Sequence, residues 1–363
     1  MAVSPALRRL RALARAATLF QPTTLTAAIQ RLGFVQADPI RAPARAQDLI
    51  LRHRVTGYRA GDLERRFATS GLEEDFLFAH GFMPAGTRAL LHPRHGGGAL
   101  PPAGLPAEVL DFVRARGPTH PRDLEARFGR ERAVNGWGGF SKATTRALEE
   151  LHHHGWVRVA GRRDGIRLYE ACAPVIGAVP EGRAREAVLL VARILAPVPI
   201  VSLRGALSLM ARHNPGLGSL APVVADALRS GALAQEEVQG EIYVSPAADS
   251  DARQPEAPQD VRFLAPFDPI VWDRRRFEHL WGWAYRFEAY TPPQKRQFGY
   301  YALPLLWGDA VIGWANVGVV GSRLDVALGY AGTVPRGARF RRALDAEVAR
   351  FERFLAPRTR RAT

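Results

Sequence analysis

A glutamine and an aspartate, Gln36 and Asp38, stand two positions apart near the start of the chain, directly before Pro39. The stretch from Phe34 to Asp38 alternates apolar and polar residues, which predicts a strand or extended segment. Because side chains two positions apart on an extended chain share a face, Gln36 and Asp38 are expected to point the same way. Such a carboxylate can stabilise positive charge and deprotonate a water. The alternative is structural, because Asp-Pro commonly starts a turn in which Asp38 would be a cap and Gln36 a surface residue.

The histidines and the cysteine are the other residues with chemical potential. His80 follows the apolar run from Phe76 to Ala79, where a buried, hydrogen-bonded histidine is the simpler expectation. The run from His152 to His154 lies on a predicted helix, so its side chains diverge and suit helix-terminal electrostatics or phosphate contacts better than one metal ion. Cys172 is the only cysteine, which excludes an intramolecular disulfide and a cysteine-rich zinc site. We therefore expect no metal and no other cofactor.

The chain is strongly basic, with a formal net charge of +15 and only two lysines, Lys142 and Lys295. Arginine binds phosphates in bidentate fashion and stacks on bases. This charge favours nucleic acid as the partner, against the alternative of a surface that is merely basic. The candidate phosphate contacts are the arginines of one predicted turn and those that follow the Gln36 segment, namely Arg162, Arg163, Arg41, Arg45, Arg52 and Arg54.

Length and composition indicate an ordered protein of several domains. The 363 residues exceed one usual hydrophobic core, and the contents of 47% hydrophobic and 23% charged residues are typical of globular proteins. The start, Met1 to Phe20, lacks the uninterrupted apolar core of a secretory signal, and no stretch is apolar enough to span a bilayer. We expect a cytoplasmic protein without a membrane partner.

Helix and strand signals recur in one order along the chain. A first helix begins at Ser4-Pro5, and a second begins at Thr23-Thr24 and ends at Gly33. Two later units each have three predicted helices followed by two β segments, the plan of a winged helix. The first of them comprises Pro106 to Arg116, Pro121 to Phe128, Ser141 to His154, Trp156 to Val159 and Ile166 to Tyr169. The second comprises Ala187 to Leu195, Ser202 to Met210, Pro222 to Arg229, Leu233 to Glu237 and Glu241 to Val244.

The C-terminal part has a different character. Pro246 to Gln259 is a predicted linker, Val261 to Gly332 is rich in aromatic and alternating apolar residues, and Arg336 to Leu355 is a predicted amphipathic helix. The expected class is therefore α+β, with tandem winged-helix domains before a β-rich, barrel-like C-terminal domain that ends in a helix. The predicted domain ranges are 1–100, 101–180, 181–247 and 248–363.

Four segments together resemble one known family. They are Gly33 to Ile40, Phe78 to His80, Leu264 to Arg274 and Tyr285 to Leu303. These segments are similar to those of the winged-helix DNA glycosylases that release alkylated bases and unhook interstrand crosslinks, the YcaQ or AlkX group, which is allied to AlkZ. The resemblance runs through most of the chain.

The resemblance implies roles for particular residues. It places a catalytic Gln-x-Asp pair at Gln36 and Asp38, and because the alkylpurine-specific relatives carry Gln-x-Gln, Asp38 assigns the chain to the crosslink-unhooking branch. The family has a Trp-Ala-His triplet facing DNA where this chain has Phe78-Ala79-His80, which keeps an aromatic wedge without the indole. The chain also departs from the family pattern at Ala315 to Val319, where the family has an Asp-x-Lys-x-Asp-Arg segment.

The aromatic and charged residues of the C-terminal motifs have two readings. We interpret them as core packing with a buried Asp-Arg pair, rather than as direct DNA contacts. The residues concerned are Trp272, Asp273, Arg274, Tyr300 and Tyr301.

The implied reaction suits these residue types. Cleavage of an N-glycosidic bond develops positive charge on the deoxyribose, which the carboxylate of Asp38 would stabilise while the amide of Gln36 holds the water or a sugar oxygen. Neither Lys142 nor Lys295 lies near Gln36 in the sequence, so we expect monofunctional hydrolysis that leaves an abasic site. The expected substrate is duplex DNA with alkylated or crosslinked bases, bound by a monomer.

Two other functions remain open from the sequence. A non-catalytic winged-helix transcription regulator would dimerise on paired half-sites. A protein-interaction scaffold would lack salt-sensitive DNA binding.

Overall fold

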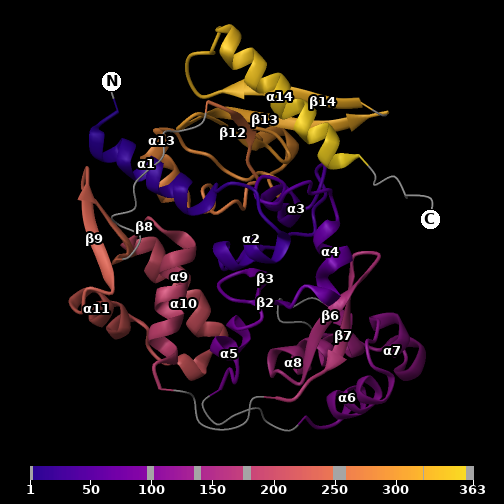
Figure 1. Cartoon of the computed structure of the whole chain (residues 1–363). Coiled ribbons are helices and arrows are strands. Elements are labelled where there is room, and N and C mark those ends of the chain that lie inside the picture. Colours follow the sequence, from indigo (N-terminus) through magenta and orange to yellow (C-terminus); the bar gives the residue numbers. More distant parts are fainter. Residues whose placement is uncertain are drawn as a thin grey trace. The chain divides into compact units, whose positions relative to one another are not determined.

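The computed structural model describes residues 3–95, 102–134, 140–174, 181–247, 259–321 and 323–356. The chain forms two compact units (Figure 1). Unit 1 comprises Met1–Leu63, Leu189–Gly205 and Asp226–Thr363, and unit 2 comprises Glu64–Val188 and Ala206–Ala225. Helices and strands occur in both units, as the predicted mixed class requires. Among these residues, no helix is both long and apolar enough to cross a bilayer.

Unit 1 begins with two helices whose ends follow the sequence signals. In α1 (Pro5–Thr18), the Ser4 hydroxyl accepts the N–H of Leu7 at 3.2 Å. In α2 (Leu25–Leu32), Thr24 is the N-cap and Gly33 ends the helix with a φ of +74°. A Cβ at Gly33 would lie 2.9 Å from Ile194 Cγ1, so both the backbone and the packing require glycine there. The chain then enters β1 (Val35–Gln36), immediately before Asp38.

The C-terminal part of unit 1 is an antiparallel sheet with a covering helix. The strands β11 (Val261–Phe263), β12 (Leu303–Trp307), β13 (Ala310–Val320) and β14 (Arg323–Tyr330) pair in that order and form a curled sheet (Figure 1). The terminal helix α14 (Ala338–Leu355) packs against β11 and β14 and buries Phe340, Phe351 and Phe354. The predicted β-rich region and terminal helix are therefore confirmed.

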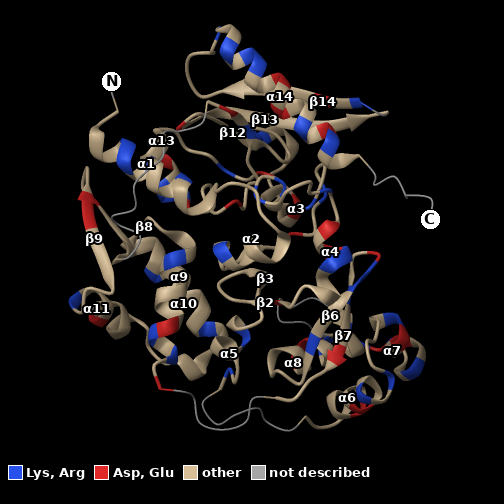
Figure 2. Ribbon diagram, viewed as in Figure 1, with Lys and Arg blue, Asp and Glu red and all other residues tan. Residues whose placement is uncertain are grey.

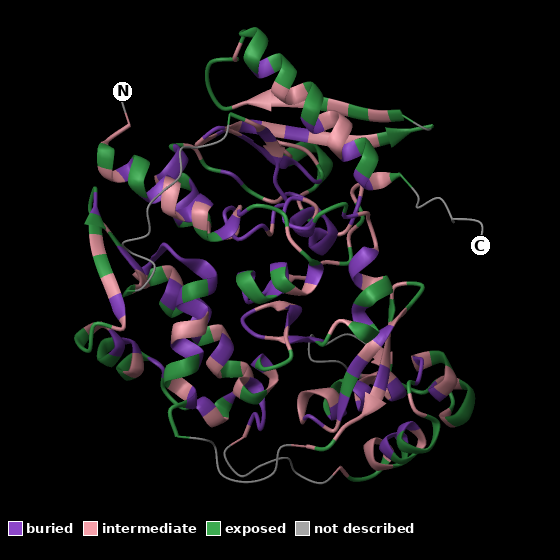
Figure 3. Ribbon diagram, viewed as in Figure 1, coloured by how far each residue is buried: buried purple, intermediate pink, exposed green. Residues whose placement is uncertain are grey.

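Other elements of unit 1 complete its core. The helix α13 (Arg274–Trp281) begins at Asp273, whose carboxylate accepts the N–H of Arg276 at 2.7 Å. Its Phe277 packs in one cluster with Leu10 of α1 and Leu306 of β12. The strands β8 (Val198–Pro199), β10 (Glu241–Pro246) and β9 (Leu233–Val238) form a second antiparallel sheet. The helix α3 (Ala46–Leu51) is buried along its whole length, which Figure 3 shows as continuous purple.

Unit 2 contains the first predicted helix–hairpin unit. Its helices are α6 (Leu105–Arg116), α7 (Pro121–Phe128) and α8 (Ala143–His153), and its hairpin is β6 (Val157–Arg163) with β7 (Ile166–Ala171). The β4 (Arg132–Val134) and β5 (Phe140–Lys142) ladder between α7 and α8 was not predicted. Unit 2 also contains the hairpin β2 (Leu72–Phe76) with β3 (His80–Pro84), followed by α5 (Thr87–Leu91).

Four helices run across the boundary between the units. They are α4 (Asp62–Arg66), α9 (Arg183–Leu195), α10 (Ile200–His213) and α11 (Ala221–Arg229). The helices and strands of both predicted helix–hairpin units are present, while their assignment as winged helices and the four domain ranges stay predictions. Most of the predicted linker, residues 248–258, lies outside the described residues. Basic residues occur along helices of both units, for example α1 and α7 (Figure 2).

Candidate active site

Asp38 lies at the end of the extended segment that begins with β1. Its Oδ1 accepts the N–H of Ile40 at 2.9 Å, which closes a turn around Pro39. Its own N–H donates to Oε1 of Gln47 on α3 at 3.4 Å. Among the described residues no donor reaches the second carboxylate oxygen, Oδ2. One oxygen of Asp38 therefore caps the turn, and the other is left for a ligand.

The surroundings of Asp38 favour proton acceptance. Burial raises the pKa of the Asp38 carboxyl above its ordinary value, and the hydrogen bond from the Ile40 N–H opposes this shift. A carboxylate with a raised pKa, once ionised, binds a proton more strongly than an exposed one does. Asp38 therefore has the properties of a general base.

Gln36 contributes an unused acceptor. Its side chain is half-buried, and among the described residues no donor bonds to its buried Oε1. Leaving a buried polar atom unpaired costs about 1–3 kcal/mol, so such atoms commonly mark a ligand or water position. The amide of Gln36 can accept a hydrogen bond from a water or a sugar hydroxyl without adding charge.

Tyr301 is a polar group near Asp38 that the sequence interpretation assigned to the core. Its ring is 4% exposed and packs edge-on against Phe287 at 5.2 Å, as a core residue would. Its hydroxyl, however, has no hydrogen-bond partner among the described residues. Burial, and next the negative charge of Asp38, raise the pKa of Tyr301. The phenol therefore stays neutral and can donate a hydrogen bond close to Asp38.

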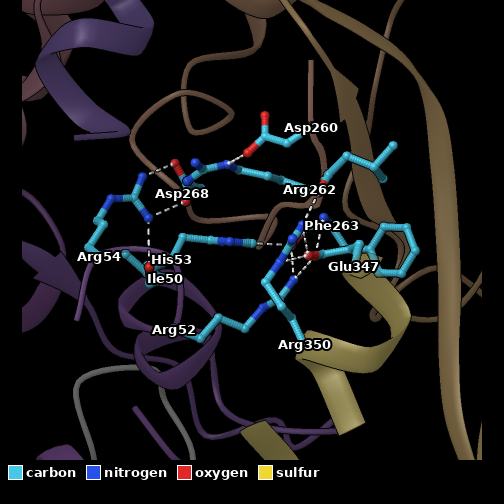
Figure 4. A network of polar contacts seen from close by, with 11 residues as sticks. Ile50, Arg52, His53, Arg54, Asp260, Arg262, Phe263, Asp268, Glu347 and Arg350 are labelled. Atoms are coloured by element: carbon cyan, nitrogen blue, oxygen red, sulfur yellow. Dashed lines mark hydrogen bonds and ion pairs between the residues drawn. The ribbon is translucent and has the colours of Figure 1, made fainter. Parts of the chain in front are cut away.

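Two predicted phosphate contacts are instead buried within unit 1, and here the prediction was wrong. Arg54 is 0% exposed, and its two terminal nitrogens each donate to an oxygen of Asp268 at 2.8 Å (Figure 4). Arg52 donates to the Phe263 carbonyl at 2.8 Å and forms an ion pair with Glu347 of α14. Because these guanidinium groups already have carboxylate partners in the interior, they are not available to DNA phosphates.

These arginines instead fix the position of α3. Arg54 follows the C-terminal end of α3, and His53 hydrogen-bonds to the Phe263 carbonyl through Nε2 at 2.9 Å. Figure 4 shows these side chains reaching from the α3 segment toward Asp268 and Glu347. Since Gln47 of α3 accepts the Asp38 N–H at 3.4 Å, this network is linked to the segment that holds the candidate base.

His80 and Arg162 both contact a buried carboxylate, Glu74, in unit 2. His80 Nε2 lies 3.0 Å from Glu74 Oε1, Arg162 Nε donates to Oε2 at 3.1 Å, and Arg167 Nε donates to Oε1 at 2.6 Å. Burial alone would raise the pKa of Glu74, but the hydrogen bond to His80 and the charges of Arg167 and Arg162 hold it well below its usual range. Arg162 therefore neutralises Glu74, and its predicted role at phosphates stays a prediction. The simpler reading of His80 as a half-buried, hydrogen-bonded side chain accounts for its contact.

The remaining predicted DNA contacts differ in exposure. Phe78 is 3% exposed, so it packs inside the protein and does not form an exposed wedge. Arg41 and Arg163 are exposed, and Arg45 is half-buried at the N-cap of α3. Arg41, Arg45 and Arg163 therefore remain candidates for phosphate contact. The run His152 to His154 ends α8 and includes half-buried side chains, with burial lowering the pKa of His152 to about 4.

The comparisons with known proteins agree with the sequence resemblance. A model of the family described as DNA glycosylase AlkZ-like matches residues 29–354, most of the chain. The fold is similar to that of Streptomyces sahachiroi DNA glycosylase AlkZ, with a TM-score of 0.63 and 17% sequence identity over 98% of this chain and 97% of that chain. The matched range contains Gln36, Asp38 and Tyr301. This chain belongs to the AlkZ-like DNA glycosylase family, which supports a DNA glycosylase role.

Proposed function

We propose that this protein is a monofunctional DNA glycosylase that hydrolyses the N-glycosidic bond of N7-alkylguanine-type bases and unhooks interstrand crosslinks. The observation that carries the proposal is the site around Asp38, where a carboxylate with a raised pKa has one oxygen that no donor of the described part of the chain reaches. Two further buried polar atoms, Gln36 Oε1 and the Tyr301 hydroxyl, lack partners among the described residues. Membership of the glycosylase family gives this arrangement its reaction class.

The proposed chemistry is a hydrolysis assisted by Asp38. The water oxygen attacks C1′ of the deoxyribose while the electron pair of the glycosidic bond passes to the leaving base, which neutralises the cationic alkylated purine. Asp38 stabilises the positive charge on the sugar and takes the proton of the water. Gln36 accepts a hydrogen bond from the water, and Tyr301 donates one to a sugar or phosphate oxygen. The products are the free base and an abasic site.

The proposal includes monofunctional action, which the lysines can test. Lys142 forms an ion pair with Glu125, while Lys295 is exposed on the segment that leads to Tyr301. Separation in sequence alone therefore does not exclude Lys295 from a Schiff base, which a bifunctional enzyme needs. Treatment with borohydride during the reaction should trap no protein–DNA adduct, and strand cleavage should be absent unless alkali is added. A trapped adduct lost in Lys295→Met would contradict monofunctional action.

Asp38→Asn, Gln36→Ala and Tyr301→Phe test the site. Asn retains an acceptor for the Ile40 N–H, so Asp38→Asn should keep the turn while losing the base. General base catalysis contributes about 10²–10⁴-fold, and release of N7-alkylguanine from duplex DNA should fall by that order in Asp38→Asn. Smaller losses are expected in Gln36→Ala and Tyr301→Phe, with the dissociation constant for DNA near the wild-type value.

Asp111→Asn is a matched control, because Asp111 is exposed and forms only a surface ion pair with Arg114. It should release base at the wild-type rate. Unchanged release by both Asp38→Asn and Gln36→Ala would refute the proposed site. A different result would instead support a transcription regulator. The wild-type protein would then bind DNA in a salt-sensitive manner, release no base, and have a mass in solution of twice the chain mass.

A further inference from the structure

Two tyrosines of unit 1 are exposed where most aromatic residues are not. Tyr290 is 80% exposed and Tyr300 is 46% exposed, and among the described residues no other Phe, Tyr or Trp is as exposed as these two. Both side chains leave much of their ring surface in contact with solvent, where a ligand can reach it. Core packing therefore does not account for either side chain.

The segment that carries these tyrosines is held closed by a buried carboxylate. Glu288 is 6% exposed and accepts the backbone N–H groups of Gln297, Phe298 and Gly299 at 2.8–3.2 Å. Although burial alone would raise the pKa of Glu288, these hydrogen bonds hold it below its usual value. Because the bonds join the two ends of the segment, Tyr290 and Tyr300 are presented by a preorganised loop, which reduces the entropy lost on binding.

The same loop supplies positive charge beside an aromatic face. The Arg296 guanidinium lies 5.1 Å from the centroid of the Tyr300 ring, and its Nε donates to the Thr291 carbonyl at 2.8 Å. Lys295 is exposed on the adjoining turn. An aromatic ring beside cations is complementary to a nucleotide, because the ring can stack on the flat base and the cations can attract the anionic phosphate.

The loop is connected to the Asp38 site through packed side chains of unit 1. Phe287 packs edge-on against Tyr290, Tyr301 and Phe267, at 6.1, 5.2 and 4.9 Å between ring centroids. Phe267 adjoins Asp268, the partner of Arg54 in the network that positions α3. Tyr301 lies within electrostatic reach of Asp38. A chain of packed side chains therefore links the exposed tyrosines to the surroundings of Asp38.

We propose that Tyr290 and Tyr300 form a stacking platform for an unpaired nucleobase beside the damaged nucleotide, with Arg296 and Lys295 contacting its phosphates. This inference rests on the proposed function, because a glycosylase that acts at Asp38 brings the base next to the lesion to this loop. Bases within an intact duplex have no free face, so the platform discriminates DNA whose stacking is already disturbed. The occupant is a DNA base, recognised through its aromatic face and not through sequence.

Binding of DNA containing 2-aminopurine tests the platform directly. The probe is a duplex with 2-aminopurine next to a stable abasic-site analogue, and its fluorescence falls when the base stacks on an aromatic ring. Wild-type protein should quench it, whereas the double variant Tyr290→Ala/Tyr300→Ala should lose the quenching and bind at least about tenfold more weakly. The double variant Tyr290→Phe/Tyr300→Phe keeps both aromatic faces and should behave as wild type. Val334→Ala truncates a side chain elsewhere that is as exposed as that of Tyr300, and it is the matched control.

The outcomes separate the platform from the proposed function. Unchanged quenching and affinity in the alanine double variant would overturn the platform, whether or not the protein releases bases. Loss of quenching and affinity in the phenylalanine double variant would also overturn the platform, because binding would then require the tyrosine hydroxyl groups and not the aromatic rings. A wild-type protein that quenches the probe but releases no base would remove the proposed reaction and keep the platform. Equal thermal unfolding midpoints should accompany each variant, because neither tyrosine is buried.

Discussion

Asp38 uses its two carboxylate oxygens differently. Oδ1 receives the Ile40 N–H and stabilises the turn, while Oδ2 is without a protein donor among the described residues. The structural and the catalytic interpretations of Asp38 are therefore compatible, since a base must be held in place before it can act.

The raised pKa of Asp38 predicts a pH dependence of base release. The carboxylate must be ionised to accept a proton, so the single-turnover rate should fall as the pH drops through the raised pKa and be constant above it. The effect on stability has the opposite direction. A carboxyl group whose pKa is higher in the folded protein favours folding at low pH, and this contribution is lost as the pH rises through the folded value. Rates between pH 4 and 8 should therefore show an acid limb that begins above the ordinary aspartate pKa.

Asp38→Asn is the control for this profile. The amide does not titrate, so the acid limb should disappear from its residual rate, and its free energy of unfolding at neutral pH should be no lower than that of the wild type. An acid limb that persists in Asp38→Asn would assign the titration to another group.

The sequence could bring Gln36 and Asp38 together as candidates because they lie in one short segment. Tyr301 could not be placed beside them, since it is distant in sequence and only packing reveals its unpaired hydroxyl. The roles of Arg52 and Arg54 were missed for the same reason. Their carboxylate partners, Glu347 and Asp268, are 295 and 214 residues away, so nothing in the local sequence distinguishes them from exposed arginines.

At the scale of elements, the Arg54–Asp268 pair joins the end of α3 to the loop after β11. Both side chains are fully buried, and the geometry is bidentate. Removing one member leaves the other charge buried without its partner. Such changes destabilise proteins by about 3–5 kcal/mol, whereas removing both charges costs much less than the sum.

A double-mutant cycle in urea measures this coupling. Arg54→Met and Asp268→Leu should each lower the free energy of unfolding by about 3 kcal/mol or more, and the double variant should recover a large part of the loss. The exposed pair Arg229 and Asp226, with side chains 75% and 55% exposed, provides the control and should contribute about 1 kcal/mol or less. Additive losses at Arg54 and Asp268 would show that the pair does not couple α3 to the loop.

Local signals predicted the helices better than the strands. The range of α7 agrees with its prediction because Pro121 begins the helix and Gly129 follows its end. The β2–β3 hairpin has no such sequence signal. Its Glu73, Glu74 and Asp75 are buried, although three successive acidic residues do not show the apolar alternation of a strand. A strand with three successive buried acids is stable only with partners elsewhere in the chain, such as Arg162 for Glu74 and Arg94 for Asp75.

For the whole molecule, the net charge is the property most easily obtained from the sequence, but it says least about which residues bind DNA. The excess of 15 positive charges predicts attraction to DNA. It does not identify the arginines that contact phosphates, because several of them neutralise buried acids, as Arg162 does for Glu74 and Arg54 for Asp268. The family match adds what the charge cannot, namely that the bound polymer is the substrate of a glycosylase.

The salt dependence of DNA binding should therefore show which of the exposed arginines contact phosphates. The logarithm of the binding constant falls linearly with the logarithm of salt concentration, with a slope of about −0.9 for each phosphate contact. If Arg41 and Arg163 contact phosphates, Arg41→Gln and Arg163→Gln should each reduce the slope by about one such step. Arg130→Gln, which removes an 81% exposed side chain that pairs with Glu125, should leave the slope unchanged. Equal slopes for all three variants would exclude Arg41 and Arg163 as phosphate contacts, and a wild-type affinity insensitive to salt would favour a protein-interaction scaffold over any DNA-binding role.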